Sequence, residues 1–153
     1  MPTRRQFLLA SAAASLAPLS LGRTLLAATA PIAITVYKDP GCECCAKWVK
    51  HLSANGFAPS VKDTPNMDEI KRSLRVPEAL QSCHTAVVGR YVVEGHVPAD
   101  DIKKLLASKE ALQGLAAPGM PVGSPGMEMG GRKDAFDIIA FTNAGKTRVY
   151  SHR

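Results

Sequence analysis

The fold is decided by residues 32–52, which read IAITVYKDPGCECCAKWVKHL. The first half is apolar and β-branched and stops at the turn sequence of residues 39–41, a pattern that predicts a short buried strand. The second half predicts a helix that stops at residues 55–56, with Trp48 and Leu52 on its buried face. Three cysteines therefore lie where a strand turns into a helix.

The rest of the chain continues this alternation. Strands are predicted at residues 60–64, 85–88 and 91–93, and helices over residues 67–74 and 98–107. The resulting order, β-α-β-α-β-β-α, is that of the thioredoxin fold. We therefore expect residues 31–153 to form a single α/β domain with a thioredoxin-like core.

Beyond this core the composition changes. Residues 114–131 are rich in Gly, Pro and Met, and we expect a long loop there. Residues 136–141 and 147–151 flank the turn sequence at residues 143–145 and predict a C-terminal β-hairpin.

The candidate site is a group of four thiols. Cys42, Cys44 and Cys45 lie at the start of the first helix, where the helix dipole favours thiolate, the form that binds metals. Cys83 directly precedes the third strand, and a thioredoxin-like fold would place it opposite the start of that helix. The sequence therefore predicts that four cysteines from two segments converge.

Sulfur donors of this kind could hold zinc, an iron–sulfur cluster or Cu(I). Structural zinc sites usually use two separated pairs of ligands, whereas this chain offers one tight group and a single thiol. The thioethers of Met120 and Met127 favour Cu(I), and Met129 is a weaker candidate in the same loop. His84 and His96 are further candidate ligands, whereas we expect the chain's two other histidines, His51 and His152, to be surface residues.

The sequence resembles the CopG-type family of small exported proteins, long known only as a domain of unknown function. Five blocks match in order: Asp39-Pro40-Gly41-Cys42-x-Cys44-Cys45-x-x-Trp48, Ser82-Cys83-His84-Thr85, Val93-Glu94-Gly95-His96-Val97-Pro98, Pro118-Gly119-Met120-Pro121 and Gly123-Ser124-Pro125-Gly126-Met127-Glu128. Members often accompany copper-resistance determinants. The resemblance implies a thioredoxin-like fold, copper held by the four cysteines, and a role in storage, transfer or redox conversion of copper.

These observations favour a copper-binding protein over an enzyme. Such a protein would hold Cu(I) as a single ion or as a multinuclear cluster. The alternative is a thiol–disulfide oxidoreductase, because Cys42 and Cys45 also satisfy Cys-x-x-Cys. Cys44 weighs against it as a competing partner for either thiol. A third reading, a metal-free domain stapled by disulfides, requires Cys83 to pair with one of the clustered cysteines.

The first thirty residues predict a signal peptide. Arg4-Arg5 precedes an uncharged, largely apolar run at residues 7–21, which resembles a twin-arginine export signal, and small residues at 27–30 suit a signal peptidase. We therefore expect a periplasmic protein with no membrane span after cleavage, whose partners are copper ions and other periplasmic copper-handling proteins.

Charge excludes one further class of partner. Loss of the three arginines in residues 1–30 reduces the net charge from +6 to +3. A net charge of that size is ordinary for a soluble domain and is smaller than the basic excess typical of nucleic-acid-binding domains. We therefore expect no nucleic-acid partner.

Replacing both Arg4 and Arg5 with lysine should hold the protein in the cytoplasm, because the twin-arginine signal is read by a receptor and not by charge alone. Cell fractionation and immunoblotting of the double variant measure this. Normal arrival of the variant in the periplasm would contradict the predicted route.

Overall fold

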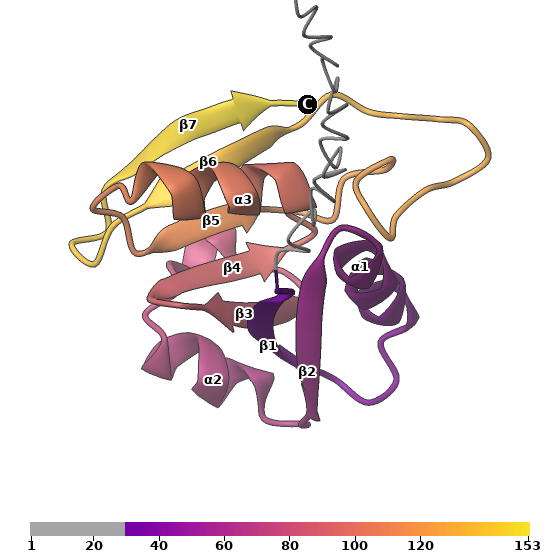
Figure 1. Cartoon of the computed structure of the whole chain (residues 1–153), viewed down its shortest axis with the longest axis horizontal. Helices are drawn as coiled ribbons and strands as arrows, with labels where there is room; N and C mark the ends of the chain where they lie inside the picture. Colours follow the sequence, from indigo (N-terminus) through magenta and orange to yellow (C-terminus); the bar gives the residue numbers. More distant parts are fainter. Residues whose placement is uncertain (1–29) are drawn as a thin grey trace, which may run out of the picture.

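The computed structural model of the chain describes residues 30–153, so almost all of the expected signal peptide lies outside the described part. Figure 1 shows one sheet with helices packed on it. The elements are β1 (Ile32–Lys38), α1 (Glu43–Ala54), β2 (Phe57–Asp63), α2 (Met67–Ser73), the 3₁₀ turn η1 (Glu78–Leu80), β3 (His84–Val88), β4 (Tyr91–Gly95), α3 (Ala99–Ser108), β5 (Gly114–Ala117), β6 (Asp137–Phe141) and β7 (Thr147–His152).

The predicted α/β class and the order β-α-β-α-β-β-α are confirmed. Most boundaries agree with the sequence pattern to within a residue or two. The exception is β2, which begins at Phe57 and not at residue 60 because its first residues pair in parallel with the start of β1.

The seven strands form one sheet in the order β2-β1-β3-β4-β5-β6-β7 (Figure 1). Strands β1 and β2 are parallel, whereas β1 and β3 are antiparallel, with Lys38 opposite His84. This register sets the end of β1 beside the start of β3. The turn that leads from β1 into α1 and the segment that carries Cys83 therefore meet at the same end of these two strands.

Side chains alternate between the two faces of the sheet, and each face has its own apolar core. On one face, Trp48 of α1 and Ile102 of α3 join the larger core, together with Val93 of β4. On the other face, Val92 of β4 and Phe141 of β6 form a smaller cluster. The sheet is thus covered on both sides, and the helix that carries the cysteines lies on the larger core.

The expectation of a continuous loop over residues 114–131 is wrong at its start. Gly114–Ala117 forms β5, which pairs with β4 on one side and β6 on the other. All four residues are buried, although glycine and alanine favour strands poorly. Burial between two neighbouring strands overrides that weak propensity, so the predicted hairpin of β6 and β7 extends the sheet.

A buried ion pair crosses the smaller face. Lys71 of α2 contacts Glu94 of β4 at 2.5 Å, and both side chains are almost fully buried. The Lys71 ammonium also donates to Thr85 Oγ1 at 3.0 Å, and the Thr85 hydroxyl donates to Glu94 Oε2 at 2.6 Å. The backbone N–H of Ser82 donates to Glu94 Oε1 at 2.6 Å. One carboxylate therefore joins α2, β3, β4 and the segment before Cys83.

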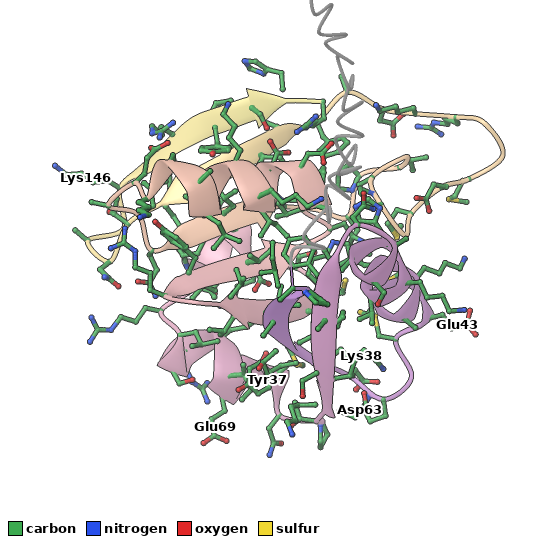
Figure 2. All side chains as sticks on the ribbon, in the orientation of Figure 1. Tyr37, Lys38, Glu43, Asp63, Glu69 and Lys146 are labelled. Atoms are coloured by element: carbon green, nitrogen blue, oxygen red, sulfur yellow. A yellow bond between two sulfur atoms is a disulfide. The ribbon has the colours of Figure 1, made fainter. Side chains whose placement is uncertain are left out.

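Asp101 of α3 is a further buried carboxylate and contacts Arg153 at 2.6 Å. Several other charged side chains lie at the periphery. Figure 2 shows Glu43, Glu69 and Lys146 pointing away from the body of the protein. Lys38, by contrast, is buried and contacts Asp63 at 2.9 Å. Among the helices of residues 30–153, none has the length and apolar content needed to cross a membrane.

Replacing Lys71 with methionine should lower the free energy of unfolding by about 3–5 kcal/mol, because Glu94 would stay buried without its cation. Adding Glu94→Gln should recover much of that loss, since the amide oxygen can still accept the Ser82 N–H without carrying a charge. Urea unfolding followed by circular dichroism measures both effects.

The matched control is Arg132→Met, which removes an exposed ion pair to Asp134. It should cost at most about 1 kcal/mol, as solvent-exposed pairs usually do. Equal losses in Lys71→Met and Arg132→Met would contradict the role given to the buried pair.

Candidate metal centre

The turn before α1 fixes the position of the first cysteine. The Lys38 ammonium donates to the carbonyl oxygens of Asp39 at 3.0 Å and Pro40 at 3.4 Å. The Asp39 carboxylate accepts the Gly41 N–H at 2.8 Å, and the Asp39 carbonyl accepts the Cys42 N–H at 3.1 Å. The short loop between β1 and α1 is thus held by hydrogen bonds at nearly every residue.

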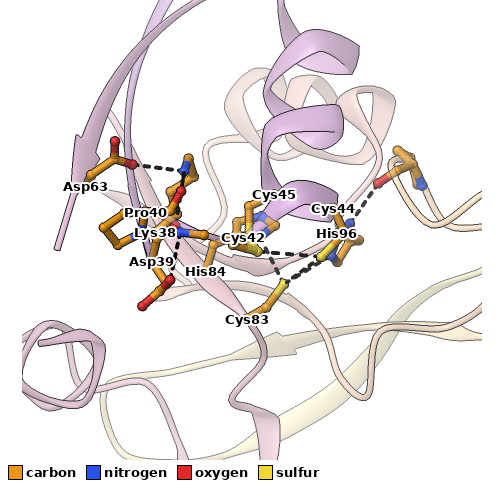
Figure 3. Close-up of a disulfide and its surroundings, with 12 residues drawn as sticks. Lys38, Asp39, Pro40, Cys42, Cys44, Cys45, Asp63, Cys83, His84 and His96 are labelled. Carbon is orange, nitrogen blue, oxygen red and sulfur yellow. Dashed lines mark hydrogen bonds and ion pairs between the residues drawn. A yellow bond between two sulfur atoms is a disulfide. The ribbon is translucent and has the colours of Figure 1, made fainter. Parts of the chain in front are cut away.

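The four cysteines converge, as predicted (Figure 3). Cys42 and Cys45 form a disulfide across the first turn of α1, with their Cα atoms 5.3 Å apart. Cys44 Sγ lies 3.5 Å from Cys42 Sγ and 4.0 Å from Cys83 Sγ. The four sulfur atoms all lie within 4.8 Å of one another, so a single metal ion or a small cluster could contact all four once the disulfide is reduced.

The disulfide changes two sequence-based expectations. Thiolates were expected at the start of α1, but Cys42 and Cys45 are paired and carry no thiolate in this state. The hypothesis of a metal-free domain held together by disulfides requires a disulfide to Cys83. The structure contradicts that requirement, because Cys44 and Cys83 are both free thiols.

Cys83 also contacts both histidines of the site. Its Sγ lies 3.3 Å from His84 Nδ1 and 3.1 Å from His96 Nε2 (Figure 3). Burial, and next the neighbouring Cys44, raises the pKa of the Cys83 thiol to about 12. Cys83 is therefore protonated at neutral pH, and a metal that binds its sulfur displaces that proton.

Both imidazoles are fully buried. Burial holds the pKa of His84 well below its usual value, with smaller contributions from His96 and Lys71. Burial also lowers the pKa of His96. The His84 ring packs against Trp48, with centroids 4.3 Å apart, and the Trp48 indole N–H donates to the Val97 carbonyl at 2.9 Å. Because burial lowers the pKa of both imidazoles, both histidines are neutral at physiological pH, and the neutral form is the one that binds metals.

The long loop folds back on the site. The carbonyl of Pro125 lies 2.8 Å from His96 Nδ1. The next residue, Gly126, has a φ of +88°, and a Cβ there would come within 2.8 Å of the Cys44 carbonyl oxygen and of the Trp48 backbone nitrogen. Glycine is therefore required where the loop touches the first turn of α1.

The methionines of this loop line a hollow beside the thiols. The hollow has a volume of about 520 Å³ and is lined by Gly41, Glu43, Cys44, Lys47, Met120, Gly126, Met127, Glu128 and Met129. Met127 is half-buried, whereas the side chain of Met120 is 43 % exposed and that of Met129 is 61 % exposed. The loop thus brings thioethers to the mouth of the site, with Cys44 as the cysteine that faces them.

The two remaining histidines, His51 and His152, differ in their exposure to solvent. His152 is exposed, as expected, and contacts Asp137 at 2.6 Å. His51 is half-buried, contrary to expectation, because its Nε2 accepts the backbone N–H of Ala99 at 3.1 Å. Neither belongs to the groups of clustered metal-binding side chains found among residues 30–153.

Two residues support the site although no role was predicted for them from the sequence. Glu94 holds the Ser82 N–H, as described above, and burial raises the pKa of its carboxyl while Lys71 acts in the opposite direction. Gly95, with a φ of +69°, leaves room for Ser82, whose side chain a Cβ would meet at 2.7 Å. A lone acidic residue within the apolar run of β4 was the available signal, since buried carboxylates need specific partners.

Comparison with known proteins places the chain in a family. The family model described as a protein of unknown function, DUF411, matches residues 80–127, which include Cys83 and both histidines of the site. Among curated proteins, none gives a significant match. Two solved structures of the copper resistance protein CopG, forms 1 and 2, are 48 % and 47 % identical to this chain. Each comparison covers 80 % of this chain and 98 % of the other, with a TM-score of 0.77. The chain therefore belongs to the CopG family of copper resistance proteins.

Proposed function

We propose that this protein binds Cu(I) in the periplasm through Cys42, Cys44, Cys45 and Cys83, and that it serves in copper resistance or handling. The observation that carries the proposal is the convergence of the four sulfur atoms within 4.8 Å. The relationship to copper resistance proteins supports copper as the ion. Thiolates can bridge metal ions, so the same four ligands are suited to a multinuclear cluster.

The chemistry of the donors supports the monovalent ion. Soft thiolate and thioether ligands select Cu(I) over harder divalent ions. All four cysteines contribute only when Cys42 and Cys45 are reduced, because a disulfide sulfur carries no negative charge. We infer that the copper-loaded state is the dithiol form and that the oxidised form holds Cu(I) more weakly.

The loop at residues 118–131 serves in this proposal as a lid. Contact of Gly126 with the first turn of α1 supports it, as does the position of Met120 and Met127 at the hollow beside Cys44. Thioethers there would shield Cu(I) from water and oxidant or complete its coordination.

Export is part of the proposal. The twin-arginine signal expected in residues 1–30 would deliver a protein that has already folded, and therefore a preformed thiol site. Copper ions, and periplasmic proteins that carry them, are the partners we propose.

One observation favours a second candidate, a thiol–disulfide oxidoreductase. The disulfide joins Cys42 to Cys45, the two residues of the Cys-x-x-Cys pair, at the start of a helix. Cys44 lies only 3.5 Å from Cys42 and would compete for it during exchange. Insulin reduction by metal-free protein separates the two functions, because only the enzyme turns over many equivalents of insulin disulfide.

Cys83→Ser should weaken Cu(I) binding by more than about 100-fold. Loss of a residue that only supports a ligand typically costs about 10–100-fold in metal affinity, and loss of a ligand itself should cost more. Serine offers a hard, protonated oxygen in place of a thiolate. The measurement is competition against a chromophoric Cu(I) chelator under argon, with protein freed of its disulfide by a phosphine reductant.

His152→Ala is the matched control, because His152 is exposed and lies outside the cluster. It should bind Cu(I) as tightly as the unmodified protein. Unchanged affinity in Cys83→Ser would reduce the site to the Cys-x-Cys-Cys segment and overturn the four-cysteine proposal.

Met120→Ala combined with Met127→Ala should leave the fold intact and keep most of the copper, because the thiolates remain. Loss of the lid should instead let a competing chelator remove copper several-fold faster, as measured by stopped-flow absorbance. Met67→Ala, on α2 and away from the hollow, should behave like the unmodified protein. Equal removal rates in all three proteins would mean that the loop methionines only fill space.

A further inference from the structure

We propose that His51 is a positioning residue of the metal centre, and that its neutral imidazole fastens residues 96–99 to the helix that carries Cys44 and Cys45. His51 comes from the second half of α1 and lies outside the groups of clustered metal-binding side chains among the described residues. The expected effect on copper rests on the proposed function. The contact itself does not, because it is made in the metal-free protein.

Two side chains of α1 hold this segment. The Trp48 indole N–H donates to the Val97 carbonyl at 2.9 Å, and His51 Nε2 accepts the Ala99 N–H at 3.1 Å. Side chains three residues apart lie on the same face of a helix, so a donor and an acceptor act side by side on one short stretch of backbone. His96 directly precedes that stretch. Its place relative to the start of α1 therefore depends on both contacts.

The Ala99 N–H needs an acceptor from outside its own helix. Ala99 is the first residue of α3, and the first N–H groups of a helix have no partner within it. The residue before it, Pro98, supplies no capping side chain, and Ala99 is buried. His51 thus does for α3 what a capping side chain usually does, but from a different helix.

Only the neutral imidazole can make this contact. Because Nε2 accepts a hydrogen bond, the single proton of neutral His51 lies on Nδ1. A protonated imidazole donates from both nitrogens and would set an N–H group against the Ala99 N–H. Protonation of His51 therefore breaks the contact and releases the start of α3.

Charged groups from two neighbouring elements face His51. They are Glu128 of the long loop and Asp100 and Lys103 of α3. Burial lowers the pKa of His51, the two carboxylates raise it, and Lys103 lowers it further. The carboxylates favour the charged imidazole, so acid should shift His51 from the Ala99 N–H toward an anionic partner. The segment that carries His96 is then held by Trp48 alone.

The first test is the unfolding of metal-free protein in urea from about pH 7.5 to about pH 5. The native pKa of His51 lies below its unfolded value of 6.5, so the unfolded chain binds more protons and stability falls with the pH below that value. His51→Gln keeps an acceptor oxygen that does not titrate. The folding constant of the unmodified protein should therefore fall up to about tenfold more per pH unit than that of the variant.

The comparison isolates His51, because His84 and His96 titrate in both proteins. A spectroscopic signature accompanies it. The imidazole nitrogen-15 shifts of metal-free protein at neutral pH should identify His51 as the tautomer with its proton on Nδ1. A side chain that only filled space would show neither the difference in pH profile nor this fixed tautomer.

The second test is the removal of Cu(I) from reduced, copper-loaded protein by a competing chelator under argon. His51→Ala should speed removal several-fold at neutral pH, and His51→Gln should restore most of the unmodified rate. Lys50→Ala, at the exposed neighbouring position of α1, is the matched control and should not change the rate. Acid should speed removal more from the unmodified protein than from His51→Gln.

Coincident unfolding profiles for the unmodified protein and His51→Gln would overturn the proposal. So would an unchanged rate of copper removal in folded His51→Ala; if that variant does not fold, equal acid acceleration in the unmodified protein and His51→Gln has the same meaning. Absence of Cu(I) binding by the unmodified protein would overturn the proposed function. The unfolding profiles and the tautomer would then still decide whether neutral His51 holds the segment.

Discussion

The buried carboxylate of Glu94 is the constraint on which the site depends. A carboxylate inside a protein is tolerated only with a full set of donors, and here the donors come from Lys71, Thr85 and the backbone of Ser82. Those donors belong to three different segments, so none can move without leaving the charge unsatisfied. The position of Cys83, next to Ser82, is therefore set from the face of the sheet opposite α1.

Much of the fold could be read from the sequence because its strands are bounded by turns and its helices have one apolar face. The strand β5 could not, since Gly114–Ala117 is short, small and without alternation. Only its neighbours define it as a strand. The convergence of Cys83 with the clustered cysteines was predictable, because it follows from strand order. The partner of each thiol was not, because Cys42 has both Cys44 and Cys45 within reach.

The contacts that prepare the site come from segments distant in sequence, which is why pattern alone did not reveal them. The Pro125 carbonyl that orients His96 lies in a loop with no regular pattern, and Gly126 reads as one more turn glycine. Sulfur and nitrogen atoms meet at Cys83, which touches Cys44 on one side and two imidazoles on the other.

The packing of Trp48 on His84 gives the molecule a built-in optical reporter. This is the only tryptophan in the chain, it is fully buried, and its ring centre lies 4.3 Å from that of His84. Indole fluorescence is sensitive to nearby imidazoles, heavy ions and paramagnetic centres. Binding of an ion at the proposed site should therefore be detectable from the emission of the unlabelled protein, in real time and at low concentration.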